Sequence, residues 1–120
     1  MERYKSFENL EGWKKAREFN KSIYLATNSS SFDNDFDLKR QLRRASVSIS
    51  SNIAEGFERN TDKEFIHFLY VAKASAGEVR SQLYLSHDLN YLSNESFSDL
   101  KFKIIEVSKI ISGLIKYLKK

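Results

Sequence analysis

Two rows of polar side chains recur at steps of three or four residues in the middle of the chain, so each row falls on one face of a helix. Their hydroxyl, amide and carboxyl groups belong to Ser48, Asn52, Glu55, Ser75, Glu78 and Gln82. Paired carboxylates such as Glu55 and Glu78 could share a proton or bind a metal. Bundle metal sites, however, place histidine three residues after glutamate, where this chain has Glu58 and Ser81. We therefore predict an interhelical hydrogen-bond network that fixes helix register, with no catalytic residue, metal or cofactor.

Other features of enzymes are missing from the sequence. The glycines are isolated, so no glycine-rich phosphate loop is present, and no serine lies on a nucleophile elbow. His67 and His87 are twenty residues apart on one predicted helix, too far to share a metal, and the chain has no cysteine. We expect a protein that is not an enzyme. In the first polar row, we expect Arg44 or Arg59 to pair with Glu55.

Basic side chains gather at two places in the sequence. One cluster begins the second predicted helix and consists of Lys39, Arg40, Arg43 and Arg44. The other is at the C-terminus and consists of Lys116, Lys119 and Lys120. Such clusters bind phosphates, because each neutralised phosphate releases counterions. Base readout also needs aromatic or amide groups beside them, and the sequence shows that pattern only weakly. A nucleic-acid surface and a solvated basic face both remain open.

The elements that position these residues are four helices, because apolar residues recur at helical spacing in four segments. Their expected bounds are about 9–28, 36–57, 62–91 and 97–120. Asn9, Asp35 or Asp37, and Thr61 with Glu64 three residues later provide helix-capping signals. Only a few residues connect the second and third helices, which predicts antiparallel neighbours. The sequence therefore predicts an all-α, antiparallel up-down-up-down four-helix bundle, with residues 1–120 forming a single domain.

Apolar and small residues predict how these helices pack. The second helix should bury Leu42, Ala45, Ile49, Ile53 and Gly56, and the third Phe65, Phe68, Ala72, Ala76, Val79 and Leu83. Small residues in the middle of both helices, among them Ser46 and Ser50, favour a close crossing between them. The fourth helix has a heptad seam of Phe97, Leu100, Ile104, Val107, Ile111, Leu114 and Leu118. Further apolar residues beside this seam, together with Tyr70, Tyr84 and Tyr91, indicate a homo-oligomer.

The composition fits a small globular domain. The chain has 120 residues, 41% of them hydrophobic and 30% charged, with no proline and a formal net charge of +4. Because the first ten residues are polar and charged, we expect no signal peptide. No apolar run is long enough to cross a bilayer, so we expect no membrane partner and a cytoplasmic location, of the bacterial or general type.

The segment from Leu38 to Gly56, which contains RRASVSISSNIAEG, is similar to the signature of a known bacterial family. The similarity continues through the KEFIHFL segment at residues 63–69 and includes the NL and WKKA segments at residues 9–10 and 13–16. This family consists of four-helix-bundle proteins encoded in intervening sequences of large-subunit ribosomal RNA genes, and it is often labelled ribosomal-protein-like. The resemblance implies an antiparallel four-helix bundle and a ring-like homopentamer. A similar bundle is the accessory protein of diversity-generating retroelements, which binds nucleic acid and reverse transcriptase.

The chain departs from this family pattern at three positions. Gly12 stands where an aliphatic residue is usual, and Ser50 and Ala74 stand where proline and glycine are common. Taken together, residues and resemblance predict a non-enzymatic oligomeric bundle that associates with structured RNA or other nucleic acid through its basic face. The alternative is a protein-interaction module with an acidic protein partner, such as a reverse-transcriptase accessory protein.

Overall fold

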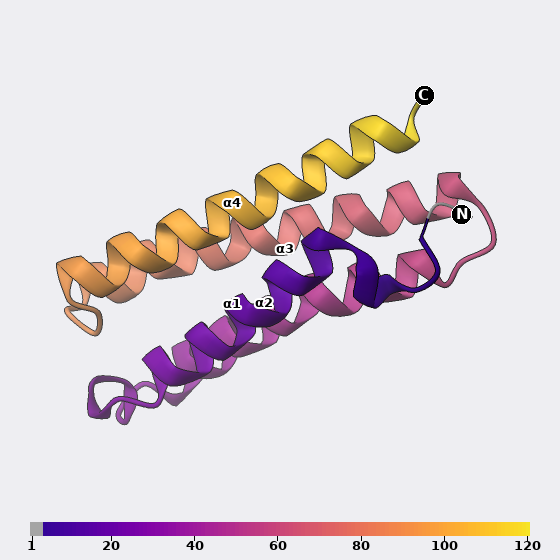
Figure 1. The fold of residues 1–120 in the computed structure, drawn as a ribbon. Helices are drawn as coiled ribbons and strands as arrows, with labels where there is room; N and C mark the ends of the chain where they lie inside the picture. Colours follow the sequence, from indigo (N-terminus) through magenta and orange to yellow (C-terminus); the bar gives the residue numbers. More distant parts are fainter. Residues whose placement is uncertain (1–3) are drawn as a thin grey trace.

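Four long helices make up most of the protein, and the computed structural model describes them within residues 4–120. They are α1 (Glu11–Thr27), α2 (Phe36–Phe57), α3 (Asp62–Asp88) and α4 (Asn94–Leu118), with short 3-10 turns η1 (Phe7–Asn9) and η2 (Ser30–Phe32). Successive helices run in alternating directions along a molecule that measures 46 × 21 × 19 Å (Figure 1). The predicted all-α four-helix bundle is confirmed.

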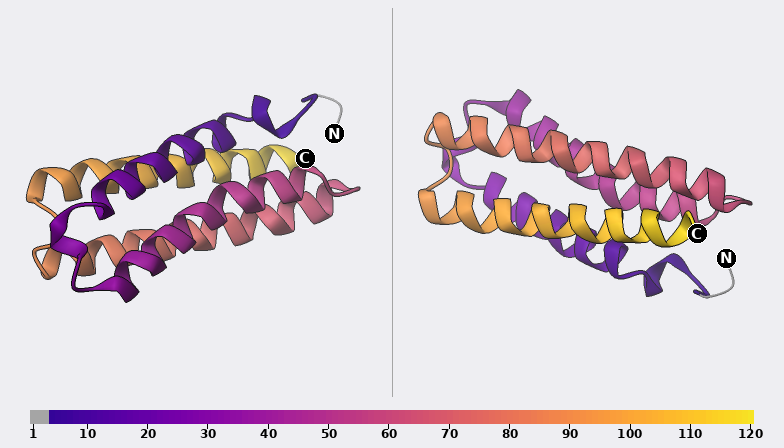
Figure 2. Two further views of the ribbon diagram at one scale, coloured as in Figure 1. Left: turned by 90° about the horizontal axis from the view of Figure 1, so that it is seen from below. Right: turned by 90° about the horizontal axis from the view of Figure 1, so that it is seen from above.

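Each helix packs against its two neighbours in the bundle. The most extensive contact joins α2 and α3, followed by α3 with α4, α1 with α2, and α1 with α4. The two views in Figure 2 show the connections between helices at the two ends of the bundle. α2 therefore lies between α1 and α3, and its two sides meet different partners.

Side chains at the helix ends satisfy the first backbone amides. Asp35 accepts a hydrogen bond from the amide of Leu38 at 3.1 Å, so the predicted cap at Asp35 is confirmed. Thr61 caps α3 by accepting from the amide of Glu64 at 3.1 Å, which is one of the two bonds of a capping box, and its hydroxyl donates to the Glu64 carboxylate at 3.2 Å. Ser93 caps α4 by accepting from the amide of Ser96 at 3.0 Å.

Three helix ends differ from the predicted bounds. α4 begins at Asn94 rather than near Phe97, because Ser93 caps it. α1 begins after η1 because Leu10 has extended backbone, so Asn9 is not its cap. α3 ends at Asp88 rather than near Tyr91, because Asn90 adopts the left-handed conformation with φ 63°. The amide of Tyr91 then donates to the carbonyl of Ser86 at 2.8 Å, and that of Asn90 to His87 at 2.9 Å. This is a Schellman motif, which ends a helix by satisfying its last carbonyls.

The core consists of aliphatic and aromatic side chains on the inner face of every helix. All five residues predicted for the second helix are buried. On α3, Leu69 is fully buried and Phe68 only half-buried, so the prediction for Phe68 is wrong. The buried residues of α3 follow steps of four and three from Phe65 through Leu69 and Ala72, and Phe68 lies beside this stripe.

The end of the bundle where α2 begins is fastened by an aromatic contact and a hydrogen bond. Tyr91, after α3, packs its ring against Phe32 of η2 with 5.2 Å between ring centroids. Its hydroxyl donates to the carboxylate of Asp35 at 3.0 Å. This hydrogen bond, with desolvation and the nearby negative charge, raises the pKa of Tyr91 above its usual value of 10.0. Asp35 thus both caps α2 and ties it to the connection between α3 and α4.

No helix within residues 4–120 combines the length and apolar character needed to cross a bilayer.

We predict that Gly56→Ala lowers the free energy of unfolding by about 2 kcal/mol, because overpacking outweighs the gain in helix propensity. An added Cβ would lie 2.6 Å from Cβ of Phe68 and 3.3 Å from the carbonyl oxygen of Phe65. The matched control is Gly77→Ala, since Gly77 is exposed on a helix and its added Cβ meets nothing within 4 Å. That control should raise the unfolding free energy by roughly 0.5–1 kcal/mol. Chemical denaturation measures both, and equal effects would contradict close packing at Gly56.

Candidate nucleic-acid interface

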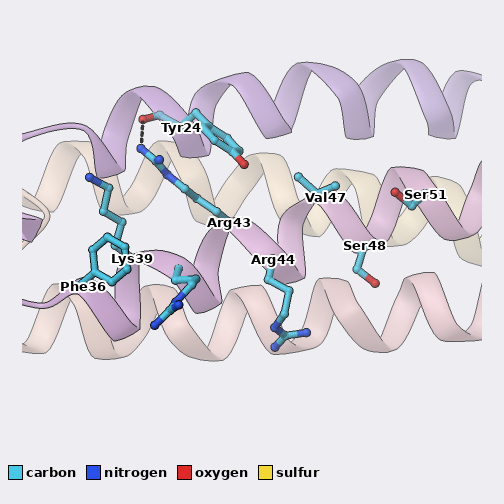
Figure 3. Close-up of a pocket in the computed structure, with 9 residues that line it drawn as sticks. Tyr24, Phe36, Lys39, Arg43, Arg44, Val47, Ser48 and Ser51 are labelled. Atoms are coloured by element: carbon cyan, nitrogen blue, oxygen red, sulfur yellow. Dashed lines mark hydrogen bonds between the residues drawn. The ribbon is translucent and has the colours of Figure 1, made fainter.

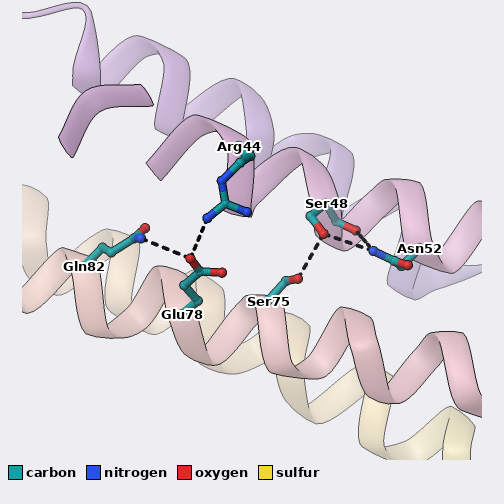
Figure 4. A network of polar contacts seen from close by, with 6 residues as sticks. All are labelled: Arg44, Ser48, Asn52, Ser75, Glu78 and Gln82. Carbon is teal, nitrogen blue, oxygen red and sulfur yellow. Dashed lines mark hydrogen bonds and ion pairs between the residues drawn. The ribbon is translucent and has the colours of Figure 1, made fainter. Parts of the chain in front are cut away.

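A polar network joins α2 to α3 along the side where they face each other (Figure 4). The hydroxyl oxygens of Ser48 and Ser75 are 3.0 Å apart and share a hydrogen bond. One turn away, Arg44 donates to the carboxylate of Glu78 at 2.6 Å. Gln82 donates to the same carboxylate at 3.4 Å. These contacts set the antiparallel register of the two helices, with Ser48 opposite Ser75 and Arg44 opposite Glu78.

Three predicted members of the network do not cross between the helices. Gln82 bonds to Glu78 on its own helix, α3. Asn52 is half-buried, but its amide donates to the carbonyl and hydroxyl of Ser48, one turn back on the same helix, at 2.8 and 3.0 Å. Glu55 is exposed, and its carboxylate has no hydrogen bond or ion pair within the part of the chain that the structure describes. The register places Phe68 near this turn of α2, as its closeness to Gly56 shows. Without a donor on α3, the carboxylate stays in water, because burying it unpaired would be unfavourable.

The expected pairing of Glu55 with an arginine is therefore wrong. Arg44 pairs with Glu78, and Arg59 pairs with Glu64 across the connection between α2 and α3 at 3.3 Å. Arg59 also lies over the ring of Phe68, 5.1 Å from its centroid. Glu55 and Glu78 consequently have different surroundings and do not form a carboxylate pair.

A second polar network, between α1 and α2, was not predicted. Asn20 donates to the hydroxyl of Ser50 at 2.9 Å and accepts from the hydroxyl of Ser46 at 2.7 Å. Ser46 and Ser50 are buried and therefore face α1, not the crossing with α3. The sequence contained one signal for this network. Ser46 and Ser50 are four residues apart on one helix face, and buried hydroxyl groups need hydrogen-bond partners.

The basic side chains at the start of α2 differ in how far the protein itself occupies them. Arg44 pairs with Glu78, and Arg40 pairs with Asp37 at 3.4 Å. Arg43 donates to the hydroxyl of Thr27 at 2.9 Å and to the carbonyl of Tyr24 at 3.3 Å. Among the described residues, the ammonium group of Lys39 has no hydrogen-bond or ion-pair partner. The arginines are thus oriented by the fold, and Lys39 contributes an uncompensated charge.

A groove of about 490 Å³ opens beside this cluster, and we call it the α2 groove (Figure 3). Four cationic side chains line it: Lys39, Arg40, Arg43 and Arg44. The remaining lining consists of the apolar or aromatic Tyr24, Phe36 and Val47 and the hydroxyl groups of Ser48 and Ser51. No carboxylate is part of this lining. Phe36 lies three residues before Lys39, so the sequence itself carried a signal for it, whereas Tyr24 comes from α1 and meets the cluster only in the folded bundle.

The guanidinium groups lie over the aromatic rings of the α2 groove. Arg43 is 4.3 Å from the centroid of Tyr24, and Arg40 is 4.9 Å from that of Phe36. Both distances are within the range of cation–π attraction. The start of α2 therefore combines positive charge with ring surfaces, the combination that the sequence indicated only weakly.

The C-terminal lysines lie at the other end of the bundle. Figure 1 shows the C-terminus far from the start of α2, near the connection between α2 and α3. Lys119 donates to the hydroxyl of Tyr70 at 2.9 Å, and Lys116 and Lys120 are exposed. The fold therefore does not bring the two predicted basic clusters into one compact site.

Acidic and imidazole groups are scattered. Within residues 4–120, no three histidine, cysteine, aspartate or glutamate residues are close enough to hold one metal ion. His67 lies edge-on to Phe68, and His87 stacks on Phe97 while its ring nitrogen contacts the side-chain oxygen of Asn94 at 2.6 Å.

The fold and this surface define a class of protein, a four-helix bundle with polar networks on both sides of α2 and a basic, aromatic groove at one end. The sequence model of the family described as 23S rRNA-intervening sequence protein matches residues 8–113. The chain therefore belongs to this family, as its sequence resemblance predicts.

A solved structure gives the same fold. It is a protein of unknown function from the S23 ribosomal protein family of Bacteroides thetaiotaomicron, with a TM-score of 0.81 and 24% sequence identity. The similarity covers 88% of this chain and 95% of that chain. Comparison with curated proteins gives no match.

We predict that Asn20→Ala lowers the free energy of unfolding by about 1–2 kcal/mol, because it leaves the buried hydroxyl of Ser46 without its acceptor. The control is Lys21→Ala at the neighbouring exposed position, which should change the unfolding free energy by less than about 0.5 kcal/mol. Urea denaturation followed by circular dichroism gives both values. If the two variants are equally stable, the network between α1 and α2 does not stabilise the bundle.

Proposed function

We propose that this protein is a non-enzymatic, oligomeric bundle that associates with structured RNA or another nucleic acid through the basic side chains at the start of α2. One observation carries the proposal: four cationic side chains line the α2 groove and no carboxylate does. Such a surface attracts a polyanion and releases its counterions on binding. The name of the family refers to an intervening sequence of 23S rRNA, and it supports an RNA context without naming a ligand.

The C-terminal lysines provide a second contact in this proposal. Lys116, Lys119 and Lys120 are exposed at the opposite end of a molecule 46 Å long. A folded RNA has charges spaced closely along its whole length, so it can reach both ends of the bundle. A single phosphate or a mononucleotide cannot.

Exposed apolar side chains support the oligomeric part of the proposal. Tyr70, Val71, Tyr84 and Leu85 on α3 and Phe102 on α4 are all exposed. Ile105 and Ile110 are half-buried and Ile115 is buried, so they supply less surface than the sequence indicated. Exposed apolar side chains of this kind favour contact between subunits.

We predict a solution mass of about five times the 14.0 kDa chain, the homopentamer that the family resemblance implies. Multi-angle light scattering over a range of protein concentrations measures this mass. A mass equal to one chain at every concentration would contradict an oligomer, and another integral multiple would contradict the pentamer alone.

The alternative is a protein-interaction module with an acidic partner, such as a reverse-transcriptase accessory protein. The exposure of Phe36 and Val47 beside the basic cluster favours it, because protein interfaces combine apolar anchors with a charged rim. Capture of one defined acidic protein from nuclease-treated lysate, together with no RNA affinity of the purified protein, would favour this alternative.

We predict that Lys39→Glu combined with Arg40→Glu lowers affinity for a structured RNA hairpin by about tenfold or more at low salt. These two residues suit the test, because neither takes part in the networks that hold the helices together. Fluorescence anisotropy at several salt concentrations measures the affinity and its salt dependence.

The control for this experiment is Lys73→Glu combined with Lys109→Glu, which changes the net charge equally at exposed positions on α3 and α4. It should retain most of the affinity. Equal losses in both double variants would indicate a general charge effect, and an undetectable affinity of the unmodified protein at low salt would refute the proposed function.

A further inference from the structure

We propose that the α2 groove holds unpaired nucleotides of a single strand, with bases on its ring surfaces and phosphates on Lys39 and Arg40. This inference rests on the proposed function and narrows it from general attraction of a polyanion to recognition of unpaired bases. A smooth basic patch would bind any phosphate backbone. The α2 groove adds concave shape, aromatic rings and hydroxyl groups to the charge.

The first observation is the apolar surface that the fold leaves open in this groove. Tyr24 is 43% exposed, Phe36 62% and Val47 38%. They come from α1 and from the start and middle of α2, and they line one groove. Any base has an aromatic face that stacks on such rings, so stacking contributes affinity without strict sequence preference.

The second observation is that Arg43 is fixed before any ligand binds. Its hydrogen bonds to Thr27 and to the carbonyl of Tyr24 hold the guanidinium over the tyrosine ring. A planar group that is already oriented loses little conformational entropy when a base stacks on it. Because Nε and one Nη of Arg43 already donate within the protein, fewer donors remain for a carboxylate. This feature favours a stacked base over an acidic peptide.

The third observation concerns the charges available to phosphates. Lys39 has no ion-pair partner within residues 4–120, and the pairing of Arg40 with Asp37 is exposed to solvent. A phosphate can therefore approach both cations without breaking a buried ion pair. Arg44 is already paired with Glu78 in the α2–α3 network, so it shapes the groove and is not the proposed phosphate contact.

These features favour an unpaired strand over a duplex. In a duplex the bases are stacked on one another and their faces are covered, so a base cannot reach Tyr24 or Phe36 while its phosphate contacts Lys39. A loop, a bulge or a single-stranded end offers a base face and a phosphate together. Structured RNA of the kind proposed above contains such elements.

The test uses the full chain and three probes of about ten nucleotides, close to the site size of other single-strand binders. They are a single-stranded RNA of mixed sequence, an abasic strand with the same number of phosphates, and an RNA duplex. The unmodified protein should bind the base-carrying strand at least about tenfold more tightly than the abasic strand, since stacking contributes this much per base. Equal affinity for both strands, or preference for the duplex, would overturn the inference.

Substitutions of the two rings test whether they cause the preference for the base-carrying strand. Tyr24→Leu combined with Phe36→Leu keeps apolar bulk but removes both rings, and it should reduce binding of the base-carrying strand to the level of the abasic strand. Its affinity for the abasic strand should not change. Phe102→Leu, at an exposed aromatic on α4, is the control and should bind all probes as the unmodified protein does. Where the double variant fails to fold, ultraviolet crosslinking of the unmodified protein should instead join the strand to peptides containing Tyr24 or Phe36, and crosslinks elsewhere would overturn the inference.

The outcomes separate this inference from the proposed function. Suppose that Lys39→Glu with Arg40→Glu abolishes RNA binding, while Tyr24→Leu with Phe36→Leu binds like the unmodified protein. The proposed function is then supported and the base-stacking site is refuted. If no probe binds at low salt, both fail. If no probe binds but an acidic amphipathic peptide does, the α2 groove serves a protein partner and the inference is overturned.

Discussion

The hydroxyl groups on opposite sides of α2 are the constraint on which the rest of the structure depends. On one side Ser46 and Ser50 bond to Asn20 of α1, and on the other Ser48 bonds to Ser75 of α3. Apolar packing alone tolerates a shift of one helix along another, but a buried hydroxyl must keep its partner. α2 is therefore fixed in register against both neighbours. That register brings Arg43 to the end of α1 beside Tyr24, and Arg44 to Glu78.

The fixed register also explains why the basic cluster is not uniform. Arg43 and Arg44 extend toward opposite neighbours of α2 and are bound there (Figure 3). These two side chains stabilise the arrangement and shape the groove, whereas Lys39 and Arg40 keep more of their charge for solvent or a ligand. An exposed ion pair contributes little stability, so Arg40 loses little by exchanging Asp37 for a phosphate. A count of basic residues would have treated all four alike.

Local signals in the sequence were sufficient for the helices and the buried face of α2, because capping groups and apolar periodicity act within a few residues. Asp35, Thr61 and the apolar residues of α2 lie where those signals indicate. The polar contacts depend on which residues of another helix stand opposite, and this requires the register. Glu55 follows Ser48 and Asn52 at helical spacing, but no donor on α3 lies opposite its carboxylate. Tyr24 and Asn20 gain their roles in the same way, from neighbours that are distant in sequence.

The departures from the family pattern show how this chain maintains its register. Ser50 stands where proline is common in the proteins that the sequence resembles, and here its hydroxyl accepts from Asn20 and donates to the carbonyl of Val47. Proline at this position would remove that acceptor and interrupt the helix hydrogen bonds. Gly12 stands where an aliphatic residue is usual, and an added Cβ would lie 3.4 Å from Ile110 of α4 and 3.9 Å from Ile53 of α2. A Cβ at position 12 would therefore make ordinary van der Waals contacts with α4 and α2, whereas Ser50 adds a directional contact. In this chain, the position of α1, and with it Tyr24 at the groove, depends on hydrogen bonding to α2 as well as on apolar packing.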